Sequence, residues 1–301
     1  ASLGIPLYQH IGGVNACILP VPGALTVIGS DRYGGGERSG GKPSYSIMAY
    51  GFKTFSEASY ACWDVADHFD KVMLQRYGLR LGNRELRHVP VPPGCVKNDN
   101  ELWDAMVEAM DKAGYTKKMG IQVDVAAGTY WESDKGKFVG LFSKGDKTKE
   151  ALMQIYKDMV KDYPFVILED PFDEVDYEGH AQVTKMLNIE VVGDDLFTTN
   201  LERLKKGVEV GACDATLLKV NQIGTISEAF DTVELAYRSG YGVMPCSSRG
   251  EGAEIADYAV GLGTGHIRES GIGPTANRFL SIEEELGSNA KFLGKNGLKM
   301  R

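Results

Sequence analysis

The chain has 301 residues, of which 43% are hydrophobic and 25% are charged, so its composition is that of a globular protein and excludes a disordered or fibrous chain. Its 33 Lys and Arg against 41 Asp and Glu leave a formal net charge of −8, which argues against nucleic acid and anionic membranes as partners, because both require a basic footprint. Five scattered cysteines without CxxC spacing predict neither a zinc site nor a disulfide framework. No apolar run reaches the ~18 residues of a membrane helix. Because this cysteine usage is typical of a reducing compartment, we expect a cytoplasmic protein.

Short apolar runs alternate with longer stretches of helical period along the chain. The runs do not alternate between polar and apolar residues, which indicates strands covered on both faces. They are Ile18–Leu25, Tyr45–Tyr50, Gly120–Ala126, Phe165–Pro171, Glu190–Asp195, Ala215–Asn221, Gly242–Ser247 and His266–Ser270. In the stretches between them, apolar residues recur at spacings of three and four, as in amphipathic helices. These stretches include Thr54–Tyr77, Lys147–Asp162, Asn200–Val210, Thr225–Ser239 and Glu254–Leu262.

Eight strands separated by helices predict an α/β fold of the (β/α)8 TIM barrel type, in one domain over residues 1–301. A doubly wound open sheet is the weaker alternative, because no Gly-x-Gly-x-x-Gly follows the first strand. The Gly-rich segment Gly29–Gly41 lies between the first two runs. We expect a long loop there, either an ordinary surface loop or a lid over a site.

Charged side chains stand at the ends of four consecutive runs. Asp124 closes the third run, Glu169 the fourth and Asp194 the fifth, and Lys219 closes the sixth. In a barrel, the carboxyl ends of the strands face one mouth, where active sites lie. The sequence therefore predicts that three carboxylates and one amine meet in the same volume.

Three carboxylates that converge in a mouth would repel and desolvate one another unless a cation held them. Oxygen-only ligands favour a hard ion, and one ligand from each of three strands suits Mg²⁺, which keeps its other positions for water or substrate. The alternative is a set of helix caps and surface ion pairs, a role that Asp170 and Asp195 also fit. We favour Mg²⁺ as the cofactor of Asp124, Glu169 and Asp194.

Lys219 follows one strand beyond the last of these acids. A lysine beside a divalent cation can act as a base, or it can simply neutralise the acidic cluster, and spacing alone does not separate the two. The combination of a magnesium ion and a lysine suggests proton abstraction next to a carboxylate, the pattern of enolase-superfamily sites.

Several stretches of the chain resemble enolase. They are Leu168-Glu169-Asp170-Pro171-Phe172, Gly193-Asp194-Asp195-Leu196, Leu217-Leu218-Lys219-Val220-Asn221-Gln222, Gly242-Val243-Met244 and Ile282-Glu283-Glu284-Glu285-Leu286-Gly287. The resemblance runs from Pro6 to the C-terminus. It implies a modified barrel whose second strand is antiparallel, with Asp124, Glu169 and Asp194 as Mg²⁺ ligands and Lys219 as the base. It also implies that the chain is the C-terminal barrel domain and begins after the N-terminal capping domain of enolases.

The residues expected to supply the general acid depart from the enolase pattern. Enolases carry Ser-His-Ala-Gly and then Gln-Glu before the second strand, whereas this chain reads Gly34-Gly35-Gly36-Glu37-Arg38 and then Pro43-Ser44. The acid of the enolase Gly-Asp-Glu-Gly-Gly motif aligns with Arg84 without a gap, or with Glu85 after a slip of one residue. Glu85 is our candidate acid, and His88 is a second one.

The phosphate-binding residues are also rewritten. Enolases have Ser-His-Arg-Ser-Gly after the seventh strand, and here the segment is Cys246-Ser247-Ser248-Arg249-Gly250. The lysine that holds the substrate carboxylate is replaced by Arg268, which keeps the charge but changes a point donor into a planar fork. We expect Ser247, Ser248, Arg249 and Arg268 to bind a small anionic carboxylate substrate.

Three functions are consistent with these patterns. The first is a Mg²⁺-dependent lyase that removes a proton α to a carboxylate through Lys219, with a substrate other than 2-phosphoglycerate or handled differently from it. The second is a drifted phosphopyruvate hydratase. The third is a catalytically silent scaffold, which the retained acids and lysine argue against. Enolases pair through both of their domains, so the resemblance also implies a homo-oligomer.

Overall fold

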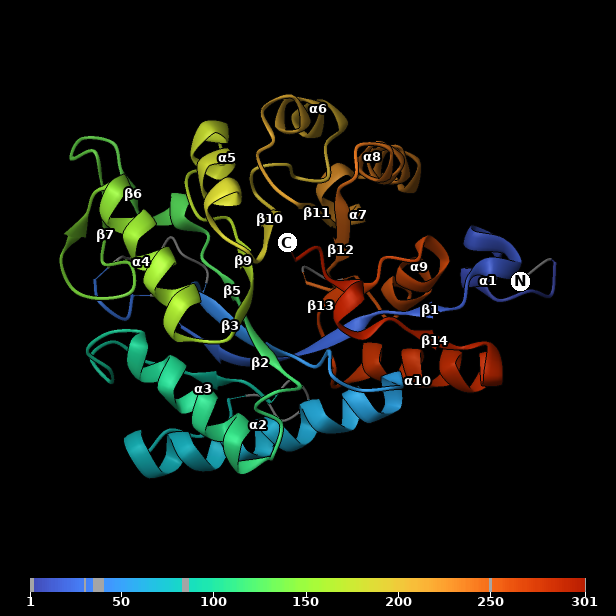
Figure 1. The fold of residues 1–301 in the computed structure, drawn as a ribbon, viewed down its shortest axis with the longest axis horizontal. Coiled ribbons are helices and arrows are strands. Elements are labelled where there is room, and N and C mark those ends of the chain that lie inside the picture. Colours follow the sequence, from blue (N-terminus) through green and yellow to red (C-terminus); the bar gives the residue numbers. More distant parts are fainter. Residues whose placement is uncertain (1–2, 30, 35–40, 83–86, 249–250, 301) are drawn as a thin grey trace.

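The computed structural model describes residues 3–29, 31–34, 41–82, 87–248 and 251–300. Its centre is a barrel of strands surrounded by helices, with α1 projecting at one side (Figure 1). The barrel strands are β2 (Val21–Ile28), β3 (Ser44–Met48), β5 (Gly120–Asp124), β9 (Phe165–Glu169), β10 (Glu190–Gly193), β11 (Ala215–Leu218), β12 (Gly242–Pro245) and β13 (His266–Ser270). The helices are α1 (Leu7–Gly12), α2 (Phe55–Tyr77), α3 (Asn100–Lys112), α4 (Lys149–Asp162), α5 (Tyr177–Met186), α6 (Leu201–Val210), α7 (Val220–Ile223), α8 (Ile226–Arg238), α9 (Ile255–Leu262) and α10 (Pro274–Leu286).

The order of the strands confirms the predicted barrel. The main sheet runs β12-β11-β10-β9-β5-β3-β2-β13, and the parallel bridges Val243–Gly265 and Cys246–Arg268 join its two ends. β3 is antiparallel to both of its neighbours, β2 and β5, whereas the other neighbouring pairs are parallel. The antiparallel second strand implied by the enolase resemblance is therefore present.

Short strands lie outside the barrel wall. β4 (Val89–Pro90) adds to β2, and β1 (Ile18–Leu19) pairs with β14 (Lys291–Phe292). β6 (Trp131–Glu132), β7 (Lys137–Val139) and β8 (Asp146–Lys147) form a small antiparallel sheet between β5 and α4.

Helix starts follow local sequence signals. Thr54, Thr148, Asn200 and Thr225 each cap the next helix by accepting a backbone N–H with a side-chain oxygen. The predicted helices are correct in position, although each predicted stretch includes one or two residues that precede the helix. α3, α5 and α10 were not among the predicted stretches and complete the ring of helices.

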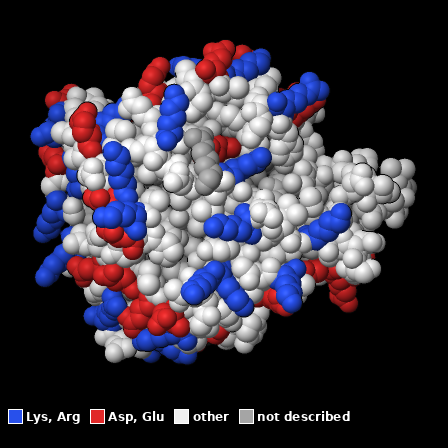
Figure 2. Space-filling model, in the orientation of Figure 1, with Lys and Arg blue, Asp and Glu red and all other residues white. Residues whose placement is uncertain are grey.

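Two packed layers hold the barrel in place. The largest apolar cluster lies between the strands and the helices and includes Val65, Phe69, Trp103 and Tyr156. A smaller cluster lies inside the barrel, where Val192, Leu217 and Met244 pack together. On the face shown in Figure 2, positive and negative side chains are interspersed around the edge. Within the described residues, no helix combines the length and apolar character needed to cross a lipid bilayer.

Candidate active site at the mouth of the barrel

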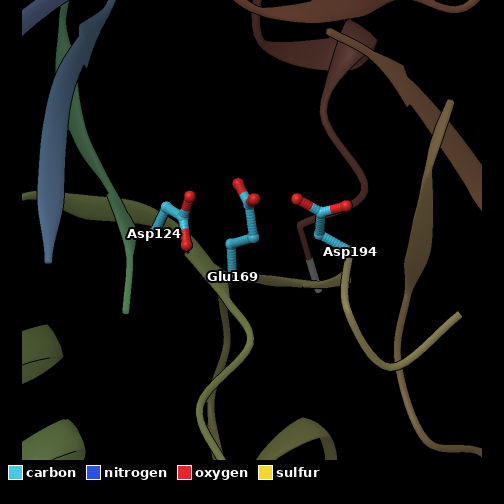
Figure 3. A group of neighbouring side chains, drawn as sticks. All are labelled: Asp124, Glu169 and Asp194. Carbon is cyan, nitrogen blue, oxygen red and sulfur yellow. The ribbon is translucent and has the colours of Figure 1, made fainter. Parts of the chain in front are cut away.

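Strand register brings the three predicted carboxylates together. Asp124 on β5 lies directly opposite Glu169 on β9, and Glu169 lies opposite Val192 on β10. Asp194 is two residues beyond Val192, so its side chain leaves the sheet on the same side. Oxygens of Asp124, Glu169 and Asp194 all lie within 4.8 Å of one another, and the three side chains are buried. Figure 3 shows them converging from adjacent strand ends.

Three cations of the chain contact these acids. Arg268 on β13 donates from Nη1 to Glu169 Oε1 at 2.9 Å, and from Nη2 to Asp124 Oδ2. Lys219 Nζ donates to Asp194 Oδ2, and Lys42 Nζ donates to Asp124 Oδ2. The expectation that the converging acids need an external cation is therefore incomplete, because three carboxylates face three basic side chains of the same chain.

These contacts set the protonation of the acids. Burial raises the pKa of Glu169 despite the nearby Arg268 guanidinium. Burial also opposes the ionisation of Asp194, but Lys219 and Arg268 outweigh it and hold the pKa of Asp194 below its usual value. Burial and the Arg268 charge together lower the pKa of Lys42 to about 8. Asp194 is thus held in its charged form more firmly than Glu169.

Neutral side chains orient the acids further. Gln122 Nε2 donates to Glu169 Oε2 at 3.1 Å, and Gln222 Nε2 donates to Asp194 Oδ1 at 2.8 Å. Asp170, which the sequence suggested as a cap or supporting residue, accepts the backbone N–H groups of Asp194 and Asp195 at 3.0 and 2.7 Å. Its carboxylate therefore fixes the turn that carries Asp194.

Lys219 lies beyond the last residue of β11 rather than within the strand. It is the residue before α7, its side chain is only 2% exposed, and its backbone N–H donates to Thr199 Oγ1 at 3.0 Å. The amine therefore points into the mouth from a buried, hydrogen-bonded backbone. Lys219 thus shares the mouth with the acids, as the sequence predicted, but it stands one residue past the strand that it was expected to close.

A cavity of about 300 Å³ opens beside the cluster. Its wall includes Lys219, Arg268 and Ser248 from the predicted set, together with Lys42 and Glu269. Ser248 Oγ lies 3.1 Å from Cys246 Sγ.

Ser247 does not line this cavity but a smaller one next to it, shared with Glu269 and Ser270. Glu85 and Arg249, as well as Arg38 and Arg84, lie outside the described residues. The remaining acid candidate, His88, is partly buried just before β4, and burial lowers its pKa.

Lys42 and Ser44 are site residues that the sequence reasoning missed. Because β3 is antiparallel, its first residues lie at the mouth where the other strands end, and Ser44 pairs with Asp124. The implied reversal of the second strand was the signal that could have found them.

Lys42 is held from two sides. The Tyr130 hydroxyl donates to the carbonyl of Lys42, and the buried Arg32 guanidinium donates to the next carbonyl, that of Pro43, at 3.1 Å. Arg32 is in turn paired with the buried Asp99 at 2.7 Å. The backbone beside the site is therefore fixed by a buried ion pair.

The acid trio fits a hard divalent ion. Its donors are carboxylate oxygens only, they come from three strands, and they are close enough to share one ion. Gln122 and Gln222 would keep two of the acids oriented toward it.

Comparison with known proteins gives a consistent answer. Residues 16–301 match the family model described as Enolase, C-terminal TIM barrel domain. The chain is 40% identical over 304 residues to a curated enolase of Methanocaldococcus jannaschii, an alignment that covers 98% of this chain and 69% of the relative. It is also 40% identical over 306 residues to the enolase of Methanopyrus kandleri, covering 98% and 70%. The chain is 39% identical over 310 residues to the enolase of Pyrococcus furiosus, covering 99% of this chain and 70% of the relative.

Proposed function

The chain belongs to the enolase family, and from that membership we propose that it is a Mg²⁺-dependent carbon–oxygen lyase. In this proposal, Lys219 removes a proton α to the carboxylate of a small, doubly anionic substrate. The observation that carries it is the contact of Lys219 with Asp194 inside a buried cluster of three carboxylates. Burying several charges this close together is costly unless they are paired with opposite charges or coordinate a metal ion.

Lys219 would act as the base. As a free amine it would accept the α-proton, and the ammonium that results would face Asp194, the partner that Lys219 contacts in the structure. Asp194 thus favours the charge that proton transfer creates, and Gln222 keeps its second oxygen oriented.

Asp124, Glu169 and Asp194 would hold the Mg²⁺ ion. When bound, the ion would supply positive charge beside the substrate carboxylate, where negative charge accumulates as the proton leaves. The oxygen-only donor set supports this assignment.

Elimination of a hydroxide also needs an acid on the opposite side of the substrate. Glu85 remains our candidate on sequence grounds. Glu269 is an alternative, because the residue lines the cavity and its carboxyl lies 3.5 Å from Arg268 Nε. Comparing the variants Glu85→Gln and Glu269→Gln separates the two: the true acid is the one whose loss slows elimination while α-proton exchange persists.

Arg268, Ser248, Ser247 and Arg249 would hold the anionic groups of the substrate. Arg268 supports this role best, because it lines the cavity and a guanidinium can grip a carboxylate or phosphate with two parallel hydrogen bonds. Ser248 offers a hydroxyl to the same cavity.

The test follows 2-phosphoglycerate with Mg²⁺ in D₂O, reading elimination by enolpyruvate absorbance and α-hydrogen exchange by NMR. We expect exchange that falls by about 10²- to 10⁴-fold in Lys219→Met, the usual contribution of a general base. Lys157→Met, an exposed lysine on α4, is the control and should leave the rate unchanged.

Elimination at a rate equal to exchange would favour a phosphopyruvate hydratase, and exchange without elimination would favour a lyase with an altered acid. If neither process occurs with 2-phosphoglycerate or with other small hydroxy- and phosphocarboxylates, and Lys219→Met changes nothing, the lyase proposal is refuted and a scaffold role is favoured.

A further inference from the structure

Arg268 occupies the centre of the acid trio. Its guanidinium contacts Asp124 and Glu169 through two different nitrogens, and Nη1 is also 3.8 Å from Asp194 Oδ2. The side chain is 5% exposed, so water screens these contacts little. One guanidinium therefore bridges all three acids, alongside Lys42 on Asp124 and Lys219 on Asp194.

A divalent ion would need the same oxygens. Mg²⁺ binds carboxylate oxygens at about 2.0–2.1 Å, so an ion shared by the three acids would lie among them. The guanidinium nitrogens already lie within hydrogen-bond distance of Glu169 Oε1 and Asp124 Oδ2. Two cations in contact with the same buried oxygens would repel each other, so the two arrangements exclude one another.

We propose that Arg268 is an internal counter-cation that competes with Mg²⁺ for Asp124, Glu169 and Asp194, and that it must leave them when the metal binds. The inference rests on the metal site of the proposed function. Arg268 also lines the cavity, so a guanidinium released from the acids is already beside the space open to a substrate anion.

The residue type matters for this competition. A guanidinium carries five donors in a planar fork and can bridge two carboxylates at once, whereas a lysine ammonium is a compact point charge. The enolase resemblance gives a lysine at this position. The arginine of this chain is thus the stronger competitor, and replacing it with lysine should weaken the competition without removing the charge.

Calorimetric titration with MgCl₂ measures the competition directly, without substrate. We expect Arg268→Met to bind Mg²⁺ about tenfold more tightly than the unaltered chain, or more, a difference of about 1.4 kcal/mol or greater. Arg268→Lys should lie between the two. Arg278→Met is the matched control. Arg278 is also a paired arginine, at 2.7 Å from Asp257, but it lies outside the acid trio, so its replacement should leave the Mg²⁺ affinity unchanged.

Thermal unfolding provides a second measurement. Without Mg²⁺, Arg268→Met should melt below the unaltered chain, because three buried acids then face only the two lysines, Lys42 and Lys219. Saturating Mg²⁺ should raise the variant's melting temperature more than that of the unaltered chain and close the gap. If Arg268→Met does not fold, Arg268→Lys decides by the same two readings.

A failure of the proposed competition can be distinguished from a failure of the proposed metal site. If the unaltered chain binds Mg²⁺ and the Arg268 variants bind it equally or more weakly, the competition is refuted while the metal site of the proposed function stands. If neither the unaltered chain nor the folded variants bind Mg²⁺, the metal site fails and the competition fails with it.

Discussion

Replacing Asp99 with asparagine should be strongly destabilising, because Asp99 is the centre of a fully buried polar cluster. Its Oδ1 accepts from Arg32 Nε at 3.1 Å and from the Tyr33 hydroxyl at 2.7 Å. Its Oδ2 accepts from Arg32 Nη2 at 2.7 Å and from the Tyr45 hydroxyl at 2.6 Å. Burial raises the pKa of both tyrosines, and the Asp99 charge adds to the effect, so both remain neutral donors.

The amide of Asp99→Asn cannot reproduce this pattern in either orientation. One of its two terminal atoms becomes an NH₂ donor that faces a guanidinium N–H and a tyrosine O–H. Arg32 is then left buried without its counter-charge, and breaking a buried pair in this way costs about 3–5 kcal/mol.

Scanning calorimetry checks this magnitude. With an unfolding entropy of about 2.1 cal/mol/K per residue, a chain of this length should lose about 5–8 °C in melting temperature. Glu234→Gln is the control, since it breaks the exposed pair of Glu234 with Arg238 and should cost under about 1 kcal/mol. A loss for Asp99→Asn no greater than that of the control would refute the reasoning. In the double variant Asp99→Asn with Arg32→Met, part of the loss should be recovered, because the orphaned charge is gone.

Two further variants test other buried groups. Burial lowers the pKa of His180 to about 4, while its Nδ1 contacts the Asp176 carbonyl at 2.8 Å. The folded state therefore binds fewer protons than the unfolded one, whose histidine titrates near 6.5, and about 3 kcal/mol of stability should be lost as the pH falls from about 6.5 to 4. Urea titrations at several pH values give the free energy of unfolding as a function of pH. In His180→Gln this free energy should fall less steeply between about pH 6.5 and 4 than in the unaltered chain, and an equal fall would contradict the assignment. In Gln222→Met, Asp194 loses an orienting donor, so calorimetry should show Mg²⁺ binding about 10- to 100-fold weaker. An unchanged Mg²⁺ affinity would show that Gln222 does not orient Asp194 for the ion.

The sequence carried enough information to predict the acid trio. Asp124 and Glu169 end β5 and β9, Asp194 follows β10, and side chains at the ends of such adjacent parallel strands must share one mouth. Most of the apolar runs extend past their strands, however, because they do not reveal where the backbone ladder stops, whereas the run Ile18–Leu25 stops short of the end of β2 at Ile28. β11 ends at Leu218, so Lys219 reaches the site from the turn before α7 rather than from the strand.

The cations around the trio were harder to predict. Arg268 was expected to hold substrate, but its contact with Asp124 and Glu169 depends on a long side chain reaching across the barrel from β13. Sequence spacing describes which strand carries a residue and not how far its side chain extends. Lys42 was missed because its position at the mouth follows from the direction of β3 and from the anchoring of Pro43 by Arg32.

The strand-borne acids and the acid- and anion-binding segments of the site differ in how firmly the fold constrains them. This difference explains where the chain departs from enolase motifs. Asp124 and Glu169 belong to buried strands, and Glu169 is fully buried beside Gln122, so changing either acid would leave an unpaired charge or an empty space in the barrel. Among the described residues, the departures at 34, 43, 82 and 246–248 lie outside the barrel strands, whereas Ser44 begins β3 and Arg268 belongs to β13. Segments outside the strands tolerate substitution without breaking the ladder. A site built this way can change its acid and its anion-binding groups while Asp124 and Glu169 stay fixed by their strands.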